Sequence, residues 1–173
     1  RKGREVFAVH RLDMDTSGII IFSKNAEAEA DLKRQFEEHT VRKTYMARLS
    51  PADPQNLSSD VPTLKPGDKG KIELPMNPDY DERPRQKVDN VQGKAALTEY
   101  EVVSVRMDGC IDILFYPHTG RTHQLRVHMA SIGHPLSGDW LYGTEDKALI
   151  ARPALHSYRL RFTHPLTEEA VDI

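Results

Sequence analysis

The sequence of 173 residues contains one cysteine and one tryptophan, and aromatic residues make up only 7% of it. A single cysteine, Cys110, excludes an internal disulfide, and no paired cysteine spacing indicates a zinc site. We therefore expect a reducing compartment, the cytoplasm, and a buried Cys110 thiol without a chemical role. No apolar run approaches the roughly 20 residues that cross a bilayer, and the first residues lack the apolar core of a signal peptide. No membrane partner is expected.

The sequence also lacks a strong excess of charge of either sign. Lys and Arg total 24 against 26 Asp and Glu, a formal net charge of -2, so the composition does not indicate nucleic-acid binding as a pI above about 9 would. The acidic residues are unevenly distributed, however. None lies within 40–52 or within 113–138, and cations fill both windows: Arg42, Lys43 and Arg48 in the first, Arg121 and Arg126 in the second. Cations interleaved with aromatic residues suit an RNA base and its phosphate backbone.

Length and periodicity predict one compact α+β domain. A helix is expected over 26–39, with Asn25 as N-cap and Ala28, Leu32 and Phe36 on its apolar stripe. A second helix is expected over 122–135, with Leu125, Met129 and Ile132 facing the core and Gly133 and Pro135 ending it. Strands are expected at 4–11, 17–24, 42–50, 71–75, 83–89, 95–105, 110–117 and, as the last, 154–162. The loop 50–70 receives no role, and we expect missing sequence before the first residue.

Two polar stretches carry the candidate chemistry. In the first, His10 and Arg11 lead into a tight turn with Asp13 and Asp15 between two apolar strands. Asp, Thr, Ser and Gly are ordinary turn residues, but a turn does not require a neighbouring guanidinium. Two carboxylates in one turn rarely reach the separation that glycoside hydrolysis requires, so we expect one working carboxylate.

The second stretch, "TGRTH", leads into the N-terminus of the second expected helix. Free backbone N–H groups at such a position favour phosphate or carboxylate binding. His123 and His128 do not indicate zinc, because five residues place them roughly 140 degrees apart on a helix. We expect no metal.

The stretch "HRLDMDTSG" resembles very closely the signature of the RNA pseudouridine synthases of the RluA class. Further blocks follow in that family's order over 6–165: "RKTYMA", "RPRQKV", "GKAALTEYEVV", "GRTHQLRVHMASIGHPLSGDWLYG" and "LHSYRLRFTHP". The resemblance implies an α+β pseudouridine synthase fold, with a mixed, mostly antiparallel sheet, flanking helices and a central active-site cleft. It also implies that 1–173 is a catalytic domain that lacks its N-terminal strand region and has no separate RNA-binding domain.

The resemblance implies isomerisation of specific uridines in RNA to pseudouridine, without cofactor or metal. Its motifs place the catalytic aspartate at Asp13, the active-site tyrosine at Tyr45 and the arginine paired with the aspartate at Arg126. The block "RPRQKV" favours large-subunit ribosomal RNA and a transfer-RNA stem-loop as substrates. We expect the protein to be a monomer. The residues expected to contact the substrate are His10, Arg11, Arg42, Lys43, Arg121, His123 and Leu125.

From the residues alone, other interpretations stay open. Tyr45 is equally a core tyrosine on a strand, and Leu125 is a core leucine by periodicity. A phenol with a pKa of about 10 is a poor base at neutral pH, so we expect Tyr45 to stack on the base rather than to remove a proton. The alternative to an isomerase is a catalytically inactive RNA-binding module of the same fold. A nucleoside or glycoside hydrolase is disfavoured because no second carboxylate is evident to activate water.

Overall fold

The computed structural model describes residues 5–51, 61–143 and 150–173. Its main sheet has seven strands, in the order β11-β10-β4-β9-β8-β5 with β2 paired to β10 outside this path. All of these pairs are antiparallel except β2 with β10. The mixed sheet and two helices confirm the α+β prediction. The strands are β2 (Ser17–Gly18), β4 (Arg42–Leu49), β5 (Lys69–Glu73), β8 (Leu97–Val105), β9 (Ile111–Pro117), β10 (Leu155–Thr163) and β11 (Ala170–Asp172).

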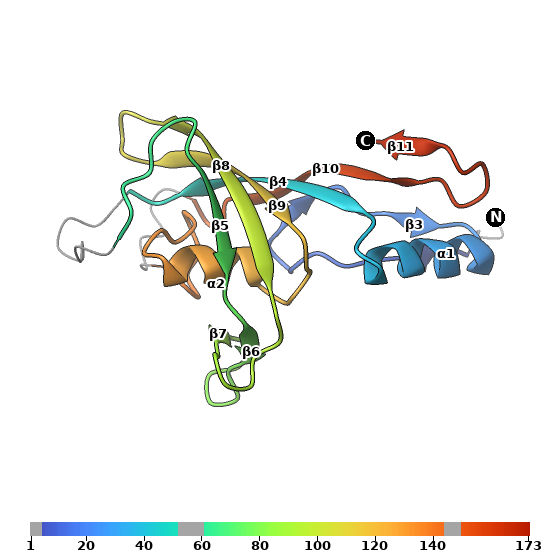
Figure 1. The fold of residues 1–173 in the computed structure, drawn as a ribbon, viewed down its shortest axis with the longest axis horizontal. Coiled ribbons are helices and arrows are strands. Elements are labelled where there is room, and N and C mark those ends of the chain that lie inside the picture. Colours follow the sequence, from blue (N-terminus) through green and yellow to red (C-terminus); the bar gives the residue numbers. More distant parts are fainter. Residues whose placement is uncertain (1–4, 52–60, 144–149) are drawn as a thin grey trace.

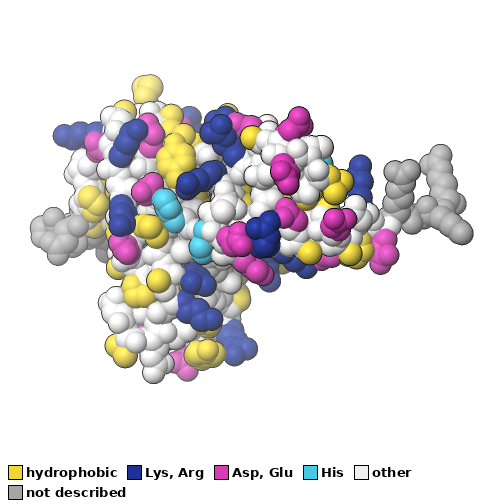
Figure 2. Space-filling model, turned by 45° about the vertical axis from the view of Figure 1, so that its right-hand side comes forward, with side chains coloured by type: hydrophobic (Ala, Val, Ile, Leu, Met, Phe, Trp, Pro, Cys, Tyr) yellow, Lys and Arg dark blue, Asp and Glu magenta, His cyan; other side chains and the backbone are white. Residues whose placement is uncertain are grey.

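Two small antiparallel sheets flank the main one. The first pairs β1 (Phe7–Ala8) with β3 (Phe22–Ser23), and the second is a hairpin of β6 (Met76–Pro78) and β7 (Gln86–Val88). The hairpin projects away from the main sheet as a separate lobe (Figure 1). Lys and Arg side chains are visible on this lobe in the space-filling view (Figure 2). The projecting lobe is therefore both charged and accessible.

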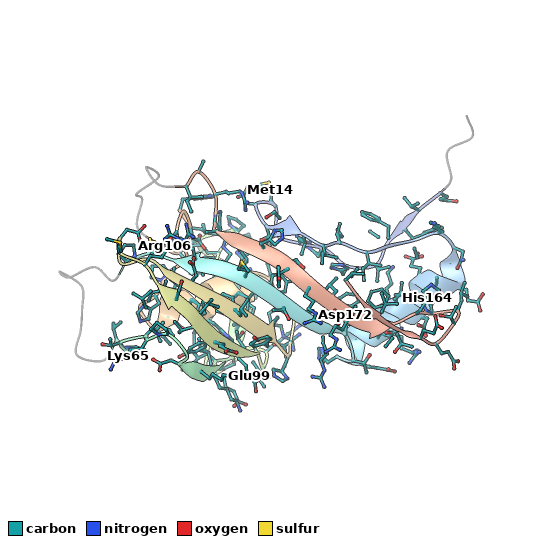
Figure 3. The ribbon with its side chains drawn as sticks, turned by 90° about the horizontal axis from the view of Figure 1, so that it is seen from above. Met14, Lys65, Glu99, Arg106, His164 and Asp172 are labelled. Carbon is teal, nitrogen blue, oxygen red and sulfur yellow. The ribbon has the colours of Figure 1, made fainter. Side chains whose placement is uncertain are left out.

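Both predicted helices are present, and both lie on one side of the main sheet. They are α1 (Ala26–Glu37) and α2 (Gln124–Ser131). The Asn25 side chain caps α1 by accepting the Ala28 N–H at 2.8 Å, and Gly133 follows α2 with φ +83, as their residue types predict. Seen from above, the strands lie in front and the helices behind (Figure 3). Within the described ranges, the helices therefore lie on one face of the sheet and leave the other face without a helix (Figure 3).

The main core lies between α2 and the sheet. Inward-facing Ala47, Ile113 and Phe115 pack in one cluster with Leu125 and Met129 of α2, which confirms the predicted apolar stripe. Three polar residues of α2 are also buried, namely Gln124, Arg126 and His128. Burying polar groups is costly unless they are hydrogen-bonded, so these three side chains require partners.

Two sequence-based predictions are wrong. The β-branched run 17–24 is not one strand, because Gly18 has φ +114 and the chain changes partner there: β2 pairs with β10 and β3 with β1. The strand at 155–163 is also not the last, since β11 pairs with it. Parts of the predicted strand at 4–11 and of the loop 50–70 lie outside the described residues.

Two further predictions can be compared with the structure. Cys110 is buried, and burial raises the pKa of its thiol, which suits an inert group. In the described part of the chain, no helix has the length and apolar character needed to cross a membrane.

The change of partner at Gly18 predicts a specific sensitivity. A Cβ on Gly18 would lie 2.6 Å from the Ser157 backbone nitrogen, in a backbone region that L residues rarely adopt. We expect Gly18→Ala to lower the free energy of unfolding by more than about 3 kcal/mol, measured by urea denaturation. Gly67→Ala is the matched control, because Gly67 has φ +88 but open space around it. Equal losses in both variants would contradict the close approach at Ser157.

Candidate active site

A cavity of about 270 Å³ opens where the first polar turn, β4, the loop after β9 and the start of α2 meet. Its walls come from segments that are far apart in the sequence, between residue 10 and residue 155. The residues that line it are His10, Arg11, Leu12, Asp13, Thr16, Phe36, Lys43, Tyr45, Pro117, Thr119, Gly120, Arg121, Thr122, Gln124, Leu125 and Leu155.

Asp13 lies in a tight turn at one wall of the cavity. The Asp13 carbonyl accepts the Thr16 N–H at 2.9 Å, which closes the turn, and Asp15 does not line the cavity. The next residue, Met14, stands out at the edge of the molecule (Figure 3) and is 92% exposed. The turn therefore presents one carboxylate inward while its tip faces solvent, as a rigid strand-end mount allows.

His10 is held in a single orientation beside this turn. Its Nε2 accepts the Ile21 N–H at 3.0 Å, and its ring stacks on Phe36 with centroids 4.7 Å apart. Burial, together with the charge of Lys43, lowers the pKa of His10, although its hydrogen bond to the Arg11 backbone opposes this. A neutral His10 with a fixed tautomer follows, so it contributes shape rather than charge to the cavity.

Strand β4 supplies two side chains to the cavity because residues two apart point to the same face of a sheet. Lys43 and Tyr45 line the cavity, whereas Arg42, one residue earlier, is exposed and does not. Burial raises the pKa of Tyr45, and the negative charge of Asp13 adds to this effect. The phenol thus stays protonated at neutral pH, in agreement with stacking or hydrogen bonding rather than base chemistry.

Gln124 shapes the wall formed by the loop after β9. Its Oε1 accepts the Thr119 hydroxyl at 2.7 Å and the Arg121 N–H at 3.0 Å, while its Nε2 donates to Thr98 Oγ1 at 3.0 Å. Thr98 in turn lies 3.0 Å from Nδ1 of the buried His128. The buried polar side chains of α2 are therefore satisfied, and they fix the loop that carries Arg121.

The predicted ion pair between Arg126 and Asp13 is wrong. Arg126 Nε and Nη2 each donate to the Asp139 carboxylate at 2.7 Å, in a bidentate pair whose side chains are 6% and 0% exposed. Asp139 also accepts the N–H groups of Leu141 and Tyr142, at 3.1 Å and 3.2 Å. Asp139 is the partner because the turn at 139–142 supplies a carboxylate that backbone N–H groups already hold in place. Burial lowers the pKa of Arg126, but the hydrogen bonds and charge of Asp139 outweigh it and raise the pKa overall.

The charge of Asp13 nevertheless interacts with Arg126 without a direct hydrogen bond between them. Its negative charge contributes to the pKa values of Tyr45, His123, Arg126 and Tyr142. These side chains come from β4, from α2 with its N-cap, and from the turn after α2. The Asp13 carboxylate therefore lies within electrostatic range of all of them, although Arg126 is neutralised by another acid.

The structure brings most of the predicted site residues together. His10, Arg11, Asp13, Lys43, Tyr45, Arg121 and Leu125 line the cavity, whereas Arg42, His123 and Arg126 do not. Sequence reasoning missed Phe36, Thr119, Gln124, Asp139 and Tyr142 as site residues. Asp139 is the first acid after the acid-free window 113–138, and this position could have indicated it as a partner for the cations of that window. Across the described ranges, no group of three or more His, Cys, Asp or Glu side chains is placed to hold a metal ion.

The buried pair predicts a large loss of stability when one partner is removed. Arg126→Met leaves the Asp139 carboxylate buried and uncompensated, so we expect a loss of about 3–5 kcal/mol in the free energy of unfolding, measured by urea denaturation. Arg159→Met is the control, because Arg159 makes a similar two-pronged contact with Asp172 but is 49% exposed. We expect a much smaller loss there. Similar losses in both variants would mean that burial does not decide the effect.

Comparison with known proteins agrees with this geometry. A family model described as RNA pseudouridylate synthase matches residues 1–131. The dual-specificity RNA pseudouridine synthase RluA of Yersinia pestis is 45% identical over 159 residues, which cover 91% of this chain and 71% of that protein. The RluA of Escherichia coli (strain K12) is 43% identical over 163 residues, which cover 91% of this chain and 67% of that protein.

Solved structures show the same fold. Human RNA Pseudouridylate Synthase Domain Containing 1 matches with a TM-score of 0.77 and 29% identity, over 98% of this chain and 68% of that one. Human RNA Pseudouridylate Synthase Domain Containing 4 matches in fold with a TM-score of 0.71 and 19% identity, over 96% of this chain and 69% of that one. The predicted family is confirmed: the chain belongs to the RNA pseudouridylate synthases, and within them to the RluA class of isomerases.

Proposed function

We propose that this isomerase converts specific uridines of ribosomal and transfer RNA to pseudouridine, with Asp13 as the catalytic carboxylate. One observation carries the proposal: Asp13 and Tyr45, which the family motifs single out, line one cavity together with Leu125, with cations around it. The relatives are named dual-specificity enzymes, which supports more than one RNA substrate. The block that contains Arg85 and Lys87 supports ribosomal RNA and a transfer-RNA stem-loop.

The reaction breaks the bond between ribose C1′ and uracil N1 and forms a bond between C1′ and uracil C5. Asp13 acts on the ribose, as nucleophile at C1′ or as base toward the sugar, and either route requires its ionised form. The electron pair of the broken bond leaves with the uracil. The base then turns within the cavity, and C5 bonds to C1′ as the Asp13–C1′ bond breaks or, in the base route, as Asp13 returns the proton to the sugar. The C5 proton then departs to solvent. Tyr45 and Leu125 hold the base during the turn.

A stacked uridine must leave its helix to enter the cavity. Flipping costs a few kcal/mol, and least in a loop, so a structured loop is the preferred target. Arg11 at the first turn, Lys43 on β4 and Arg121 on the loop before α2 offset this cost through phosphate contacts. Arg42, which is exposed and outside the cavity, is assigned to RNA farther from the target base.

The proposal includes a monomeric enzyme in the cytoplasm, in which residues 1–173 act as one catalytic domain. The walls of the cavity come from segments between His10 and Leu155, which supports an undivided domain. The single, buried Cys110 is typical of proteins from a reducing compartment.

Release of tritium from RNA labelled at uracil C5 tests the catalytic assignment. We expect Asp13→Asn to abolish release while RNA affinity changes by no more than a few-fold, because the acid is removed without removing a cation. Asp15→Asn is the matched control, a neighbouring acid outside the cavity, and should keep full activity. Full activity of Asp13→Asn would refute the assignment. Free uracil in the products would indicate a hydrolase, and binding without release an inactive module.

Lys43 predicts a pH dependence of RNA binding. Burial lowers its pKa to about 8, and its Nζ donates to the Thr119 carbonyl at 3.2 Å. Because only the ammonium form attracts phosphate, its contribution is complete well below pH 8 and is lost as the pH rises through that value. We expect affinity to fall by about three- to tenfold between pH 7 and pH 9 at constant ionic strength, measured by fluorescence anisotropy. Lys43→Arg keeps its charge and should not show the fall. An equal fall in that variant would assign the effect to another group.

A further inference from the structure

The hydroxyl of Tyr142 joins two parts of the molecule. It accepts the N–H of Gln86, the first residue of β7, at 2.8 Å, and it lies 2.7 Å from Nδ1 of His123, the N-cap residue of α2. The Tyr142 ring packs against the small apolar cluster that contains Met76 of β6 and Val127 of α2. One side chain therefore holds the projecting hairpin against the start of the helix.

The same ring also contacts Arg126 and His123. The Arg126 guanidinium lies over the ring, 5.0 Å from its centroid, and His123 meets the ring nearly edge-on with centroids 5.6 Å apart. Both ring contacts would survive replacement of the phenol by a phenyl group, whereas the two hydrogen bonds would not. Tyr142→Phe therefore distinguishes the effect of the hydroxyl's hydrogen bonds from the effect of the ring's packing.

The hydrogen bonds of the hydroxyl favour one tautomer of His123. A phenol has one proton to donate, and the Gln86 N–H can only donate to its oxygen. Within the described ranges, the remaining hydrogen bond of this hydroxyl is the one with His123 Nδ1, and donation to that nitrogen is the arrangement that pairs the phenol proton. Burial raises the pKa of Tyr142 to about 12 and lowers that of His123, which keeps both groups neutral at pH 7. A neutral imidazole that accepts at Nδ1 carries its proton at Nε2.

His123 lies between two cavity-lining residues in the sequence, and its Nε2 has no hydrogen-bond partner within the described ranges. Within the described ranges, His123 Nδ1 makes the only side-chain hydrogen bond of this residue. Thr122 and Gln124, on either side of it in sequence, line the cavity. The charge of Asp13 also acts on the His123 ring. His123 therefore offers a neutral N–H donor within electrostatic range of the proposed catalytic carboxylate.

We propose that Tyr142 is a positioning residue that holds His123 as the Nε2–H tautomer, so that His123 donates a hydrogen bond to an oxygen of the bound RNA. The inference rests on the proposed function for its substrate but not for its geometry. The proposal also connects the β6–β7 hairpin to the site, because the Tyr142 hydroxyl that accepts the Gln86 N–H is the same hydroxyl that holds the His123 tautomer.

Nitrogen-15 NMR of the histidine-labelled protein without RNA tests the geometry directly. We expect the Nε2–H tautomer for His123 at pH 7, assigned by loss of its signals in His123→Gln, and a mixture of both tautomers in Tyr142→Phe. Tyr158→Phe is the control, because Tyr158 is 51% exposed on β10 and outside the cavity, and it should match the wild type. A wild-type His123 that is cationic or protonated at Nδ1 would overturn the proposal.

Kinetics of tritium release test the consequence. We expect Tyr142→Phe to raise KM about tenfold with kcat within twofold, and His123→Leu to do the same. His123→Gln, which keeps a donor N–H, should restore most of the affinity. Tyr142→Phe should add nothing in the His123→Leu background, because the hydroxyl acts through His123. Additive effects, or an unchanged KM in Tyr142→Phe, would refute the role.

The two proposals fail in different ways. If the wild type releases no tritium from ribosomal or transfer RNA, the proposed function is wrong. In that case the role of Tyr142 is decided by two other measurements on the same variants. One is a tenfold loss of RNA affinity in Tyr142→Phe and His123→Leu, and the other is the His123 tautomer from NMR.

Discussion

A buried ion pair between Arg126 and Asp139 organises the half of the site built around α2. With only eight residues, α2 is too short to be stable alone, and its burial requires a partner for the guanidinium at its centre. Asp139 supplies that partner while it accepts two backbone N–H groups of its own turn. The pair therefore fixes the turn that carries Tyr142, and through Tyr142 it fixes the hairpin and His123.

This arrangement separates two tasks that one ion pair between Arg126 and Asp13 would combine. Arg126 stabilises the fold with a carboxylate that lies outside the cavity. Asp13 keeps its carboxylate in the cavity, where its charge reaches residues from β4, α2 and the turn after α2. In this account, the Asp13 carboxylate is surrounded by cations and neutral hydrogen-bond donors, and the buried Arg126 pairs with Asp139 instead.

The sequence predicted the local parts of the structure and missed the parts set by distant contacts. Periodicity predicted both helices, and strand alternation accounts for Lys43 and Tyr45 facing the cavity together. The run around Gly18 was predicted as one strand because its β-branched residues favour sheet, but pairing with two different strands divides it. The meeting of Asp13 with Tyr45 came only from the family resemblance, because no local pattern joins segments so far apart. Asp139 was missed for the same reason.

Double-mutant cycles on the free energy of unfolding test the central claim most directly, by pairing Arg126→Met first with Asp139→Asn and then with Asp13→Asn. The account predicts a coupling energy of about 2–3 kcal/mol between Arg126 and Asp139, and less than about 0.5 kcal/mol between Arg126 and Asp13. The reverse order of the two couplings would contradict it, because Asp13 would then be the true partner of Arg126.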